Sequence, residues 1–202
     1  MRVYSYKLTR DYGFAPNPFN GVCTLATCKP QVRTHAKVGD LVFGCGSSEL
    51  NLADHLIFAL QVEEKLTFDQ YWNDERFFSK RPAFNGSLKR AYGDNIYHKD
   101  GKNWVQADSH HSLDHGELNT SNLNRDTGSD NVLISSNFVY WGGSALKIPL
   151  VFLDFEGDSL YPGGRPHRSI FSDSFTQALY AWFSSISLKG CRGRPGSWPA
   201  PI

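Results

Sequence analysis

The sequence predicts an α+β domain, built as a twisted, mostly antiparallel sheet or as a small open β-barrel with a few packed helices. Three observations lead to this prediction. Most apolar stretches are short and alternate with polar residues, Gly, Pro and Asn interrupt them, and only the last long segment has clear helical spacing. A chain of 202 residues with 40% apolar and 14% aromatic residues can bury a sizeable core.

Strands and loops are expected in the first third of the chain. Alternation over residues 4–8 predicts a strand, and the two prolines and two glycines of GFAPNPFNG (13–21) indicate a loop. The stretch CTLATCKP (23–30) is compatible with one helical turn that ends before its proline. Strand-like apolar patterns then follow in two segments, residues 37–46 and 55–66.

A short helix is predicted over residues 67–78. Thr67 is its expected N-cap, and Gln70, three residues later, completes a capping box. The later run GELNTSNLNRDTGSDN (116–131) is polar and rich in turn-forming residues, so it is expected to be an exposed loop.

The dipeptide Asp100-Gly101 is a strong signal for a two-residue hairpin turn. With this turn, Tyr97 would lie opposite Trp104 on the neighbouring strand. Aromatic cross-strand pairs of this kind stabilise a hairpin by up to about 1 kcal/mol relative to alanines.

The last third predicts two strands and one helix. The strands are expected at residues 132–142 and 146–155. The helix is expected over residues 171–186, where apolar side chains recur at helical spacing, with Ser174 and Gln177 as a possible capping box.

Composition narrows the class of protein. The 21 basic and 20 acidic residues give a formal charge of +1, which argues against broad phosphate neutralisation along a duplex but allows a nucleotide, a flipped base or a short single strand. No apolar run is long enough for a membrane span, and the first residues lack the pattern of a signal peptide. The four unevenly spread cysteines are typical of reduced thiols in a cytoplasmic protein.

The only local basic bias identified in the sequence lies near its end. Residues 187–202 contain Lys189, Arg192 and Arg194 among Gly, Pro and Ser. This composition predicts a flexible tail after a single domain over residues 1–186.

The segment 93–115 holds four of the seven histidines, and metal binding is the first of three explanations for it. His111 and His115 would share one face if they lay on a helix. No H-E-x-x-H motif is present, and the pair Cys23 and Cys28 has no matching second pair. No metal and no cofactor are therefore expected.

Nucleophilic catalysis is the second explanation. Ser109 beside His110 and His111, or Cys28 with a remote histidine, can be drawn as a nucleophile and a base. Adjacent residues on a strand point to opposite faces, so adjacency in sequence does not assemble such a pair. Nothing resembles a nucleophile elbow, a P-loop or a dinucleotide fingerprint. Enzymatic activity stays open at this point.

The third explanation is a pocket for a planar heterocycle. Stacking of a base on an aromatic ring is worth about 1–3 kcal/mol, and a few polar groups can then recognise its edge. The alternative is that about half of the aromatic residues belong to the core. The candidates are the aromatic residues Tyr12, Phe14, Phe19, Trp72, Tyr97, Trp104, Tyr140 and Trp141 and the polar residues Asn17, Asp94, Asn95, His98 and Ser109.

Ordered motifs in the chain resemble the nucleotide modification associated domain, in the branch with the signatures F-A-P-N-P-F-x-G and C-x-L-A-x-C-K-P. The similarity covers about residues 2–155, including LIFALQVEEKLTFDQYWNDERF and GDNIYH…WVQADSHH. More loosely, the order KVGDLVFG…LIFALQVEEKLTFDQYW is similar to PUA-like domains such as EVE, YTH and ASCH. EVE and YTH domains hold a modified base in an aromatic cage.

These resemblances imply a cytoplasmic, bacterial PUA-like domain that binds a modified nucleobase or nucleotide, free or in DNA, in DNA modification or phage defence. Matched motif positions include Pro18, Thr24 and Cys28. The expected nucleotide-binding residues are Phe14, Asn17, Phe19, Lys29, Trp72, Asp94, Asn95, His98, Trp104, Ser109, His110, His111 and Trp141.

Chemistry suggests a role for each group of these residues. Trp104, Trp141 or Phe19 would stack on the base, whereas Asn17, Asp94 and Asn95 would recognise its edge. His98 or His110 would contact sugar or phosphate together with Lys29. The alternative is an enzyme acting on a nucleotide or base, with His98, His110 or His111 as general base and Asp94 or Asp108 orienting it.

Overall fold

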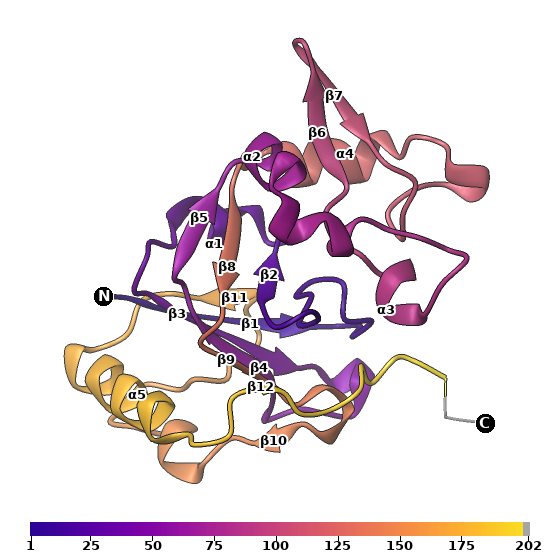
Figure 1. The fold of residues 1–202 in the computed structure, drawn as a ribbon. Helices are drawn as coiled ribbons and strands as arrows, with labels where there is room; N and C mark the ends of the chain where they lie inside the picture. The colour runs from indigo at the N-terminus through magenta and orange to yellow at the C-terminus, as the bar shows by residue number, and fades with distance from the viewer. Residues whose placement is uncertain (200–202) are drawn as a thin grey trace. The chain divides into compact units, whose positions relative to one another are not determined.

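The computed structural model describes residues 1–199 and shows two compact units (Figure 1). Within the described residues, unit 1 comprises Met1–Tyr12, Ala36–Val62 and 136–199, and unit 2 comprises Gly13–His35 and Glu63–Ser135. Each unit has its own sheet. The residue ranges show that the chain leaves unit 1 and returns to it twice. No helix in the described part of the chain is both long and apolar enough to cross a bilayer.

Unit 1 is built on an open, seven-stranded sheet. Its order is β11-β1-β3-β4-β9-β12, and β10 pairs with β4. The pairs β1–β3 and β9–β12 are parallel, and the other pairs are antiparallel. The strands are β1 (Val3–Leu8), β3 (Leu41–Gly46), β4 (His55–Gln61), β9 (Phe138–Tyr140), β10 (Leu146–Lys147), β11 (His167–Arg168) and β12 (Gly190–Cys191).

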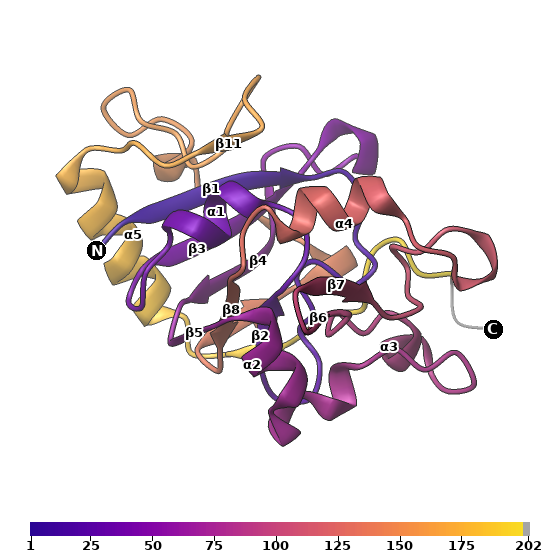
Figure 2. The same cartoon turned by 90° about the horizontal axis from the view of Figure 1, so that it is seen from above.

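The core of unit 1 lies between this sheet and α5 (Asp173–Ser185) (Figure 2). Phe175, Leu179 and Phe183 recur every four residues, so they form one apolar face of the helix and pack on strand residues such as Phe43. The helix is capped by Ser172, which accepts a hydrogen bond from the backbone N–H of Phe175. The predicted capping box at Ser174 and Gln177 is therefore wrong by two residues.

Three short 3₁₀ segments complete unit 1, namely η1 (Ser48–Leu50), η4 (Gly142–Ser144) and η5 (Leu150–Phe152). The strand predicted at 146–155 is reduced to β10, because the chain turns into η5 after Pro149. In the tail predicted at 187–202, β12 pairs with β9, and Asp11 accepts a hydrogen bond from the backbone N–H of Gly196. Residues 200–202 lie outside the described residues.

Unit 2 combines a three-stranded antiparallel sheet, a hairpin and short helices. The sheet has the order β2-β8-β5, with β2 (Cys23–Leu25), β8 (Val132–Ser135) and β5 (Glu64–Leu66). The hairpin consists of β6 (Tyr97–Asp100) and β7 (Asn103–Gln106). The helical segments are α1 (Pro30–His35), α2 (Phe68–Asn73), η2 (Glu75–Lys80), α3 (Leu88–Ala91), η3 (Asp114–Gly116) and α4 (Thr120–Thr127).

The structure confirms one of the helix and loop predictions for unit 2 and corrects two others. The capping box of Thr67 and Gln70 is present at the start of α2. The stretch 23–30 is instead β2 followed by a turn, and Pro30 begins α1, because proline suits the first position of a helix. The segment 116–131 is not only a loop, since it contains α4, which Asn119 caps.

The hairpin forms one residue away from its predicted register. Asp100 pairs with Asn103 and Lys99 with Trp104, so the turn residues are Gly101 and Lys102. Gly101 has φ of +61°, as the first central residue of a II′-type turn requires. Tyr97 therefore lies opposite Gln106 instead of Trp104. Both sheets are open, which confirms the predicted α+β class in its twisted-sheet form.

Candidate active site

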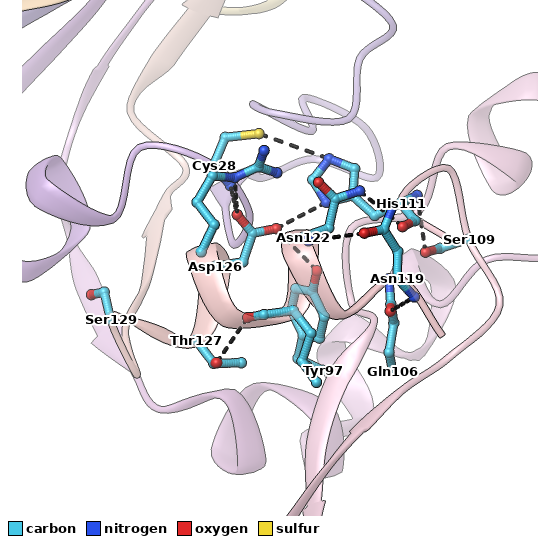
Figure 3. A network of polar contacts seen from close by, with 12 residues as sticks. Cys28, Tyr97, Gln106, Ser109, His111, Asn119, Asn122, Asp126, Thr127 and Ser129 are labelled. Carbon is cyan, nitrogen blue, oxygen red and sulfur yellow. Dashed lines mark hydrogen bonds and ion pairs between the residues drawn. The ribbon is translucent and has the colours of Figure 1, made fainter. Parts of the chain in front are cut away.

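A cysteine, a histidine and an aspartate from separate segments meet in unit 2 (Figure 3). The Sγ atom of Cys28 lies 3.9 Å from Nε2 of His111, and Nδ1 of His111 lies 2.9 Å from Oδ2 of Asp126. Cys28 is half-buried, whereas the Asp126 side chain is fully buried. This is the order of groups that activates a nucleophile: a reachable thiol, a base, and a carboxylate that orients the base.

Cys28 is held by its backbone in an unusual conformation. Cys28 and Lys29 have φ of 57° and 41°, in the left-handed region, immediately before α1 begins at Pro30. Such conformations cost about 1–3 kcal/mol each and persist only where the surroundings enforce them. Here the Cys28 N–H donates to Oδ1 of Asp126 over 3.0 Å, and the Cys28 carbonyl accepts from Nε of Arg33 over 2.8 Å.

His111 is fixed by contacts on both sides of its backbone. Its N–H donates to Oγ of Ser109 over 3.2 Å, and its carbonyl accepts from Nδ2 of Asn122 on α4 over 2.9 Å. The ring of Phe14 packs edge-on against the imidazole, with centroids 4.6 Å apart. The imidazole therefore has one nitrogen toward Asp126 and the other toward Cys28.

Asp126 is the centre of the network. Its Oδ2 atom accepts from His111 and from the hydroxyl of Tyr97, the latter over 3.0 Å, and its Oδ1 atom accepts from Cys28 N–H and from Nε of Arg125 over 3.2 Å. Four donors around one carboxylate strongly favour its charged form. The pKa of Asp126 is accordingly lowered, although burial alone would raise it.

Arg33 brings the surrounding backbone together. This fully buried guanidinium donates to four carbonyls, those of Cys28, Asp126, Ser129 and Asn131. Two of these carbonyls belong to the residues of the network itself. Burial lowers the pKa of Arg33 to about 10, partly offset by Asp126, so the side chain stays cationic at neutral pH.

The charge state of His111 follows from its two partners. Burial would lower its pKa, but the hydrogen bonds to Asp126 and Cys28 raise it to about 9. At neutral pH the ring is therefore an imidazolium, and it lies beside the sulfur of Cys28.

Three expected nucleotide-binding residues lie in a different, fully buried network. Asp94 accepts from the hydroxyls of Thr24 and Tyr71 over 2.7 and 2.8 Å, and burial raises its pKa to about 6. Asn17 accepts from the buried Lys80 ammonium over 2.7 Å. The amide nitrogen of Asn95 donates to the carbonyls of Tyr71 and Phe77 over 3.1 and 3.3 Å.

The expected aromatic and histidine residues divide into separate places. Phe14 and His110 gather around His111, with Phe14 and His110 centroids 5.4 Å apart. Trp72 stacks on His98 at 4.1 Å. Trp104 packs edge-on against Phe68, Phe19 is buried beside Lys89, and Lys29 follows Cys28 directly.

Trp141 belongs to unit 1. It lines an open cleft of about 490 Å³ with Trp182, Leu188 and Arg192. The cleft is mostly apolar, and Arg192 gives it one cationic group.

Ser109 is not paired with a base, because its Oγ atom meets the backbone of His111 and not its ring. The sequence pattern does not indicate Asp126 as a site residue, because residues 116–131 are predicted to be a loop, whereas the structure forms α4 there. The available signal was weak: Asn119 as an N-cap, followed by Leu123 and Asp126 three residues apart on one helix face. Among residues 1–199, no group of three or more His, Cys, Asp or Glu side chains is arranged to hold a metal ion.

Comparison with known proteins gives one match. The family model of nucleotide modification associated domain 2 matches residues 1–200, which confirms the resemblance seen in the motifs and extends it past residue 155. No curated protein and no solved structure matches the chain.

Proposed function

The chain belongs to the nucleotide modification associated domain 2 family, and we propose that it is a cysteine-dependent enzyme that transfers or hydrolyses an acyl group on a nucleobase or nucleotide. The observation that carries this proposal is the alignment of Cys28, His111 and Asp126, with separations of 3.9 and 2.9 Å. The nucleotide part of the proposal comes from the family.

The proposed chemistry uses the sulfur of Cys28 as the nucleophile and the His111 ring, 3.9 Å away, as the group that gives and takes the proton. The Cys28 thiolate attacks a carbonyl carbon, a new C–S bond forms, and the carbonyl electron pair moves to oxygen. When this adduct collapses, the leaving group departs with the Nε2 proton of His111, and a thioester remains on Cys28. Water or an amine then attacks the thioester, gives its proton back to His111, and releases the acyl product and the thiolate.

Asp126 orients the imidazole and stabilises its charged form throughout. The Cys28 N–H already donates to Asp126, so it is not available to stabilise the oxygen of the adduct. That oxygen must be stabilised by other donors, such as groups brought by the substrate.

Alkylation with iodoacetamide tests the nucleophile without a known substrate. Cys191 is exposed and serves as an internal comparator. Cys28 is half-buried, so by access alone it would react no faster than Cys191. Peptide mapping at pH 6.5 is expected to find Cys28 alkylated faster than Cys191, and His111→Gln should remove this advantage. Equal or slower labelling of Cys28 in the wild-type protein would contradict the proposed activation.

Turnover is tested with a panel of nucleosides and nucleotides carrying acylated amino groups, and with unmodified nucleotides plus a thioester acyl donor. Mass spectrometry of the products is expected to show a change that Cys28→Ser abolishes and Cys191→Ser leaves intact. Absence of any product, together with unselective labelling, would exclude the enzyme.

Binding without chemistry is the second candidate function, and the cleft of unit 1 favours it. Two indoles, Trp141 and Trp182, and the Arg192 guanidinium line this cleft, which suits a planar anionic ligand such as a nucleotide. Calorimetric titration with modified nucleotides separates the candidates: a pure binder loses affinity in Trp141→Ala and shows no turnover.

A further inference from the structure

The basic bias at residues 187–202 is not the only one in the chain: unit 2 contains a second basic segment, which takes no part in the chemistry proposed above. Residues 76–93 contain no Asp or Glu. Two of their cations are already satisfied, because Arg76 pairs with Glu64 and Asp74, and Lys80 is buried against Asn17. Arg81, Lys89 and Arg90 remain, and within residues 1–199 none of them has a carboxylate at ion-pair distance.

Two exposed phenylalanine rings lie in the same segment as these cations. Phe84 is 58% exposed and Phe78 is 41% exposed, which is unusual for phenylalanine in a folded domain. The guanidinium of Arg81 lies 4.1 Å from the centre of the Phe78 ring and 4.0 Å from that of Trp72. Arg81 thus covers one face of the Phe78 ring, and the more exposed ring is that of Phe84. Cations beside exposed aromatic rings form the surface that proteins use to bind single-stranded nucleic acid, where phosphates meet the cations and bases stack on the rings.

The exposed part of the segment is anchored at its base. The Ala83 N–H donates to the carbonyl of Arg90 over 3.0 Å, which closes the loop that carries α3 (Figure 1). Below it, the Asn95 N–H donates to the carbonyl of Lys80 over 3.1 Å. A loop closed in this way presents its side chains on a preformed surface, so ligand binding loses little conformational entropy in ordering the loop.

The segment ends beside the candidate active site. Tyr92 packs edge-on against His110 with ring centroids 5.1 Å apart, and Asn17 holds the Tyr92 carbonyl at 3.0 Å. His110 in turn packs on Phe14, which contacts His111. A continuous run of rings therefore connects the basic loop to the imidazole that faces Cys28.

We propose that residues 78–92 bind a short single-stranded nucleic acid and lead one of its bases to Cys28. This inference rests on the proposed function for the role of Cys28, and it narrows the substrate from a free nucleotide to a base within a strand. The three cations support contacts with only a few phosphates, in keeping with a formal charge of +1 for the whole chain.

The test measures binding of fluorescently labelled 12-nucleotide single strands by anisotropy, with DNA and RNA as separate arms. Phe84→Ala is expected to weaken binding by about tenfold, the usual effect of losing one stacking partner. Arg90→Ala should weaken binding and reduce the slope of log affinity against log salt by about 0.7, because one phosphate contact is lost. The matched control is Lys102→Ala, because Lys102 is an exposed lysine in the hairpin turn of the same unit. This variant should change neither the affinity for the strand nor the salt slope.

The proposal would be overturned if neither the DNA nor the RNA strand binds. It would also be overturned if Lys102→Ala lowers the affinity for the strand as much as Arg90→Ala does, or if polyaspartate displaces the labelled strand as effectively as unlabelled strand does. Phe84, Arg90 and Lys102 are exposed, and thermal melting confirms that each variant is folded. If the strand binds but Cys28 shows neither selective alkylation nor turnover, only the proposed chemistry is contradicted. If free nucleotides are turned over but no strand binds, only this inference is contradicted.

Discussion

The Nδ1 atom of His111 lies 2.9 Å from Oδ2 of Asp126, although the two residues are 15 positions apart in the chain. Both side chains are buried, so water screens their interaction only weakly. The pair therefore sets the charge, the tautomer and the direction of the imidazole that faces Cys28. Most expectations for unit 2 follow from this single contact.

Replacing Asp126 by Asn should lower the pKa of His111 from about 9 toward or below its ordinary value. The amide keeps the shape of the side chain but removes the negative charge that stabilises the imidazolium. NMR titration of the His111 ring protons measures the change. Asp130→Asn is the control, because that carboxylate pairs with Lys99 near the surface, and it should leave the titration of His111 unchanged.

The stability of unit 2 should depend on pH through His111. The folded pKa of about 9 lies above the unfolded value of about 6.5, so the stabilisation is fully present below pH 6.5 and is lost as the pH rises through 9. Chemical denaturation at pH 6 and pH 9.5 should show the wild-type protein losing on the order of 3 kcal/mol that His111→Gln does not lose. If the free energy of unfolding changes equally in the two proteins between pH 6 and pH 9.5, the raised pKa of His111 is contradicted.

Asp126 acts in the opposite pH range. Its folded pKa is lowered, so its contribution is present above the unfolded value of about 3.9 and is lost as the pH falls through the folded value. Asp126→Asn should therefore cost stability at pH 6 and progressively less in strong acid. Denaturation curves of both proteins between pH 2 and 6 measure this difference.

Arg33→Met should destabilise the protein by about 3–5 kcal/mol, because it leaves the carbonyls of Cys28, Asp126, Ser129 and Asn131 without their donor. The matched change Arg76→Met removes the ion pairs with Glu64 and Asp74 from a side chain that is 58% exposed and should cost less than about 1 kcal/mol. Urea denaturation compares the two variants. Similar costs would mean that Arg33 does not organise the site.

A pair of glycines tests the packing of the unit 1 sheet. A Cβ atom at Gly44 would lie 2.0 Å from Cε1 of Phe58, its direct partner on β4, whereas one at Gly164 would meet nothing within 4 Å. Gly44→Ala should therefore cost about 1–3 kcal/mol or more, and Gly164→Ala should be nearly neutral. Thermal melting of both variants checks this difference, and equal melting temperatures would contradict the close contact.

Sequence signals that act over a few residues predicted local structure well. The capping box of Thr67 and Gln70 was predicted correctly because both partners lie within one helical turn. The hairpin around Gly101 was found one residue out of register, since a turn signal fixes its position only to within a residue when neither face is strongly apolar. Helix α4 was missed, because its few apolar residues give a weak periodic pattern and Leu123 and Asp126 are buried only by tertiary contacts.

By itself, the sequence determined the α+β class, the apolar face of α5 and the family of the chain. It also offered Cys28 with a distant histidine as one nucleophile among several. Only the tertiary structure selected that pair and supplied Asp126, because residues 28, 111 and 126 come together through contacts that no local pattern encodes. A helix or turn is determined by interactions between near neighbours, whereas a catalytic arrangement depends on how distant segments pack.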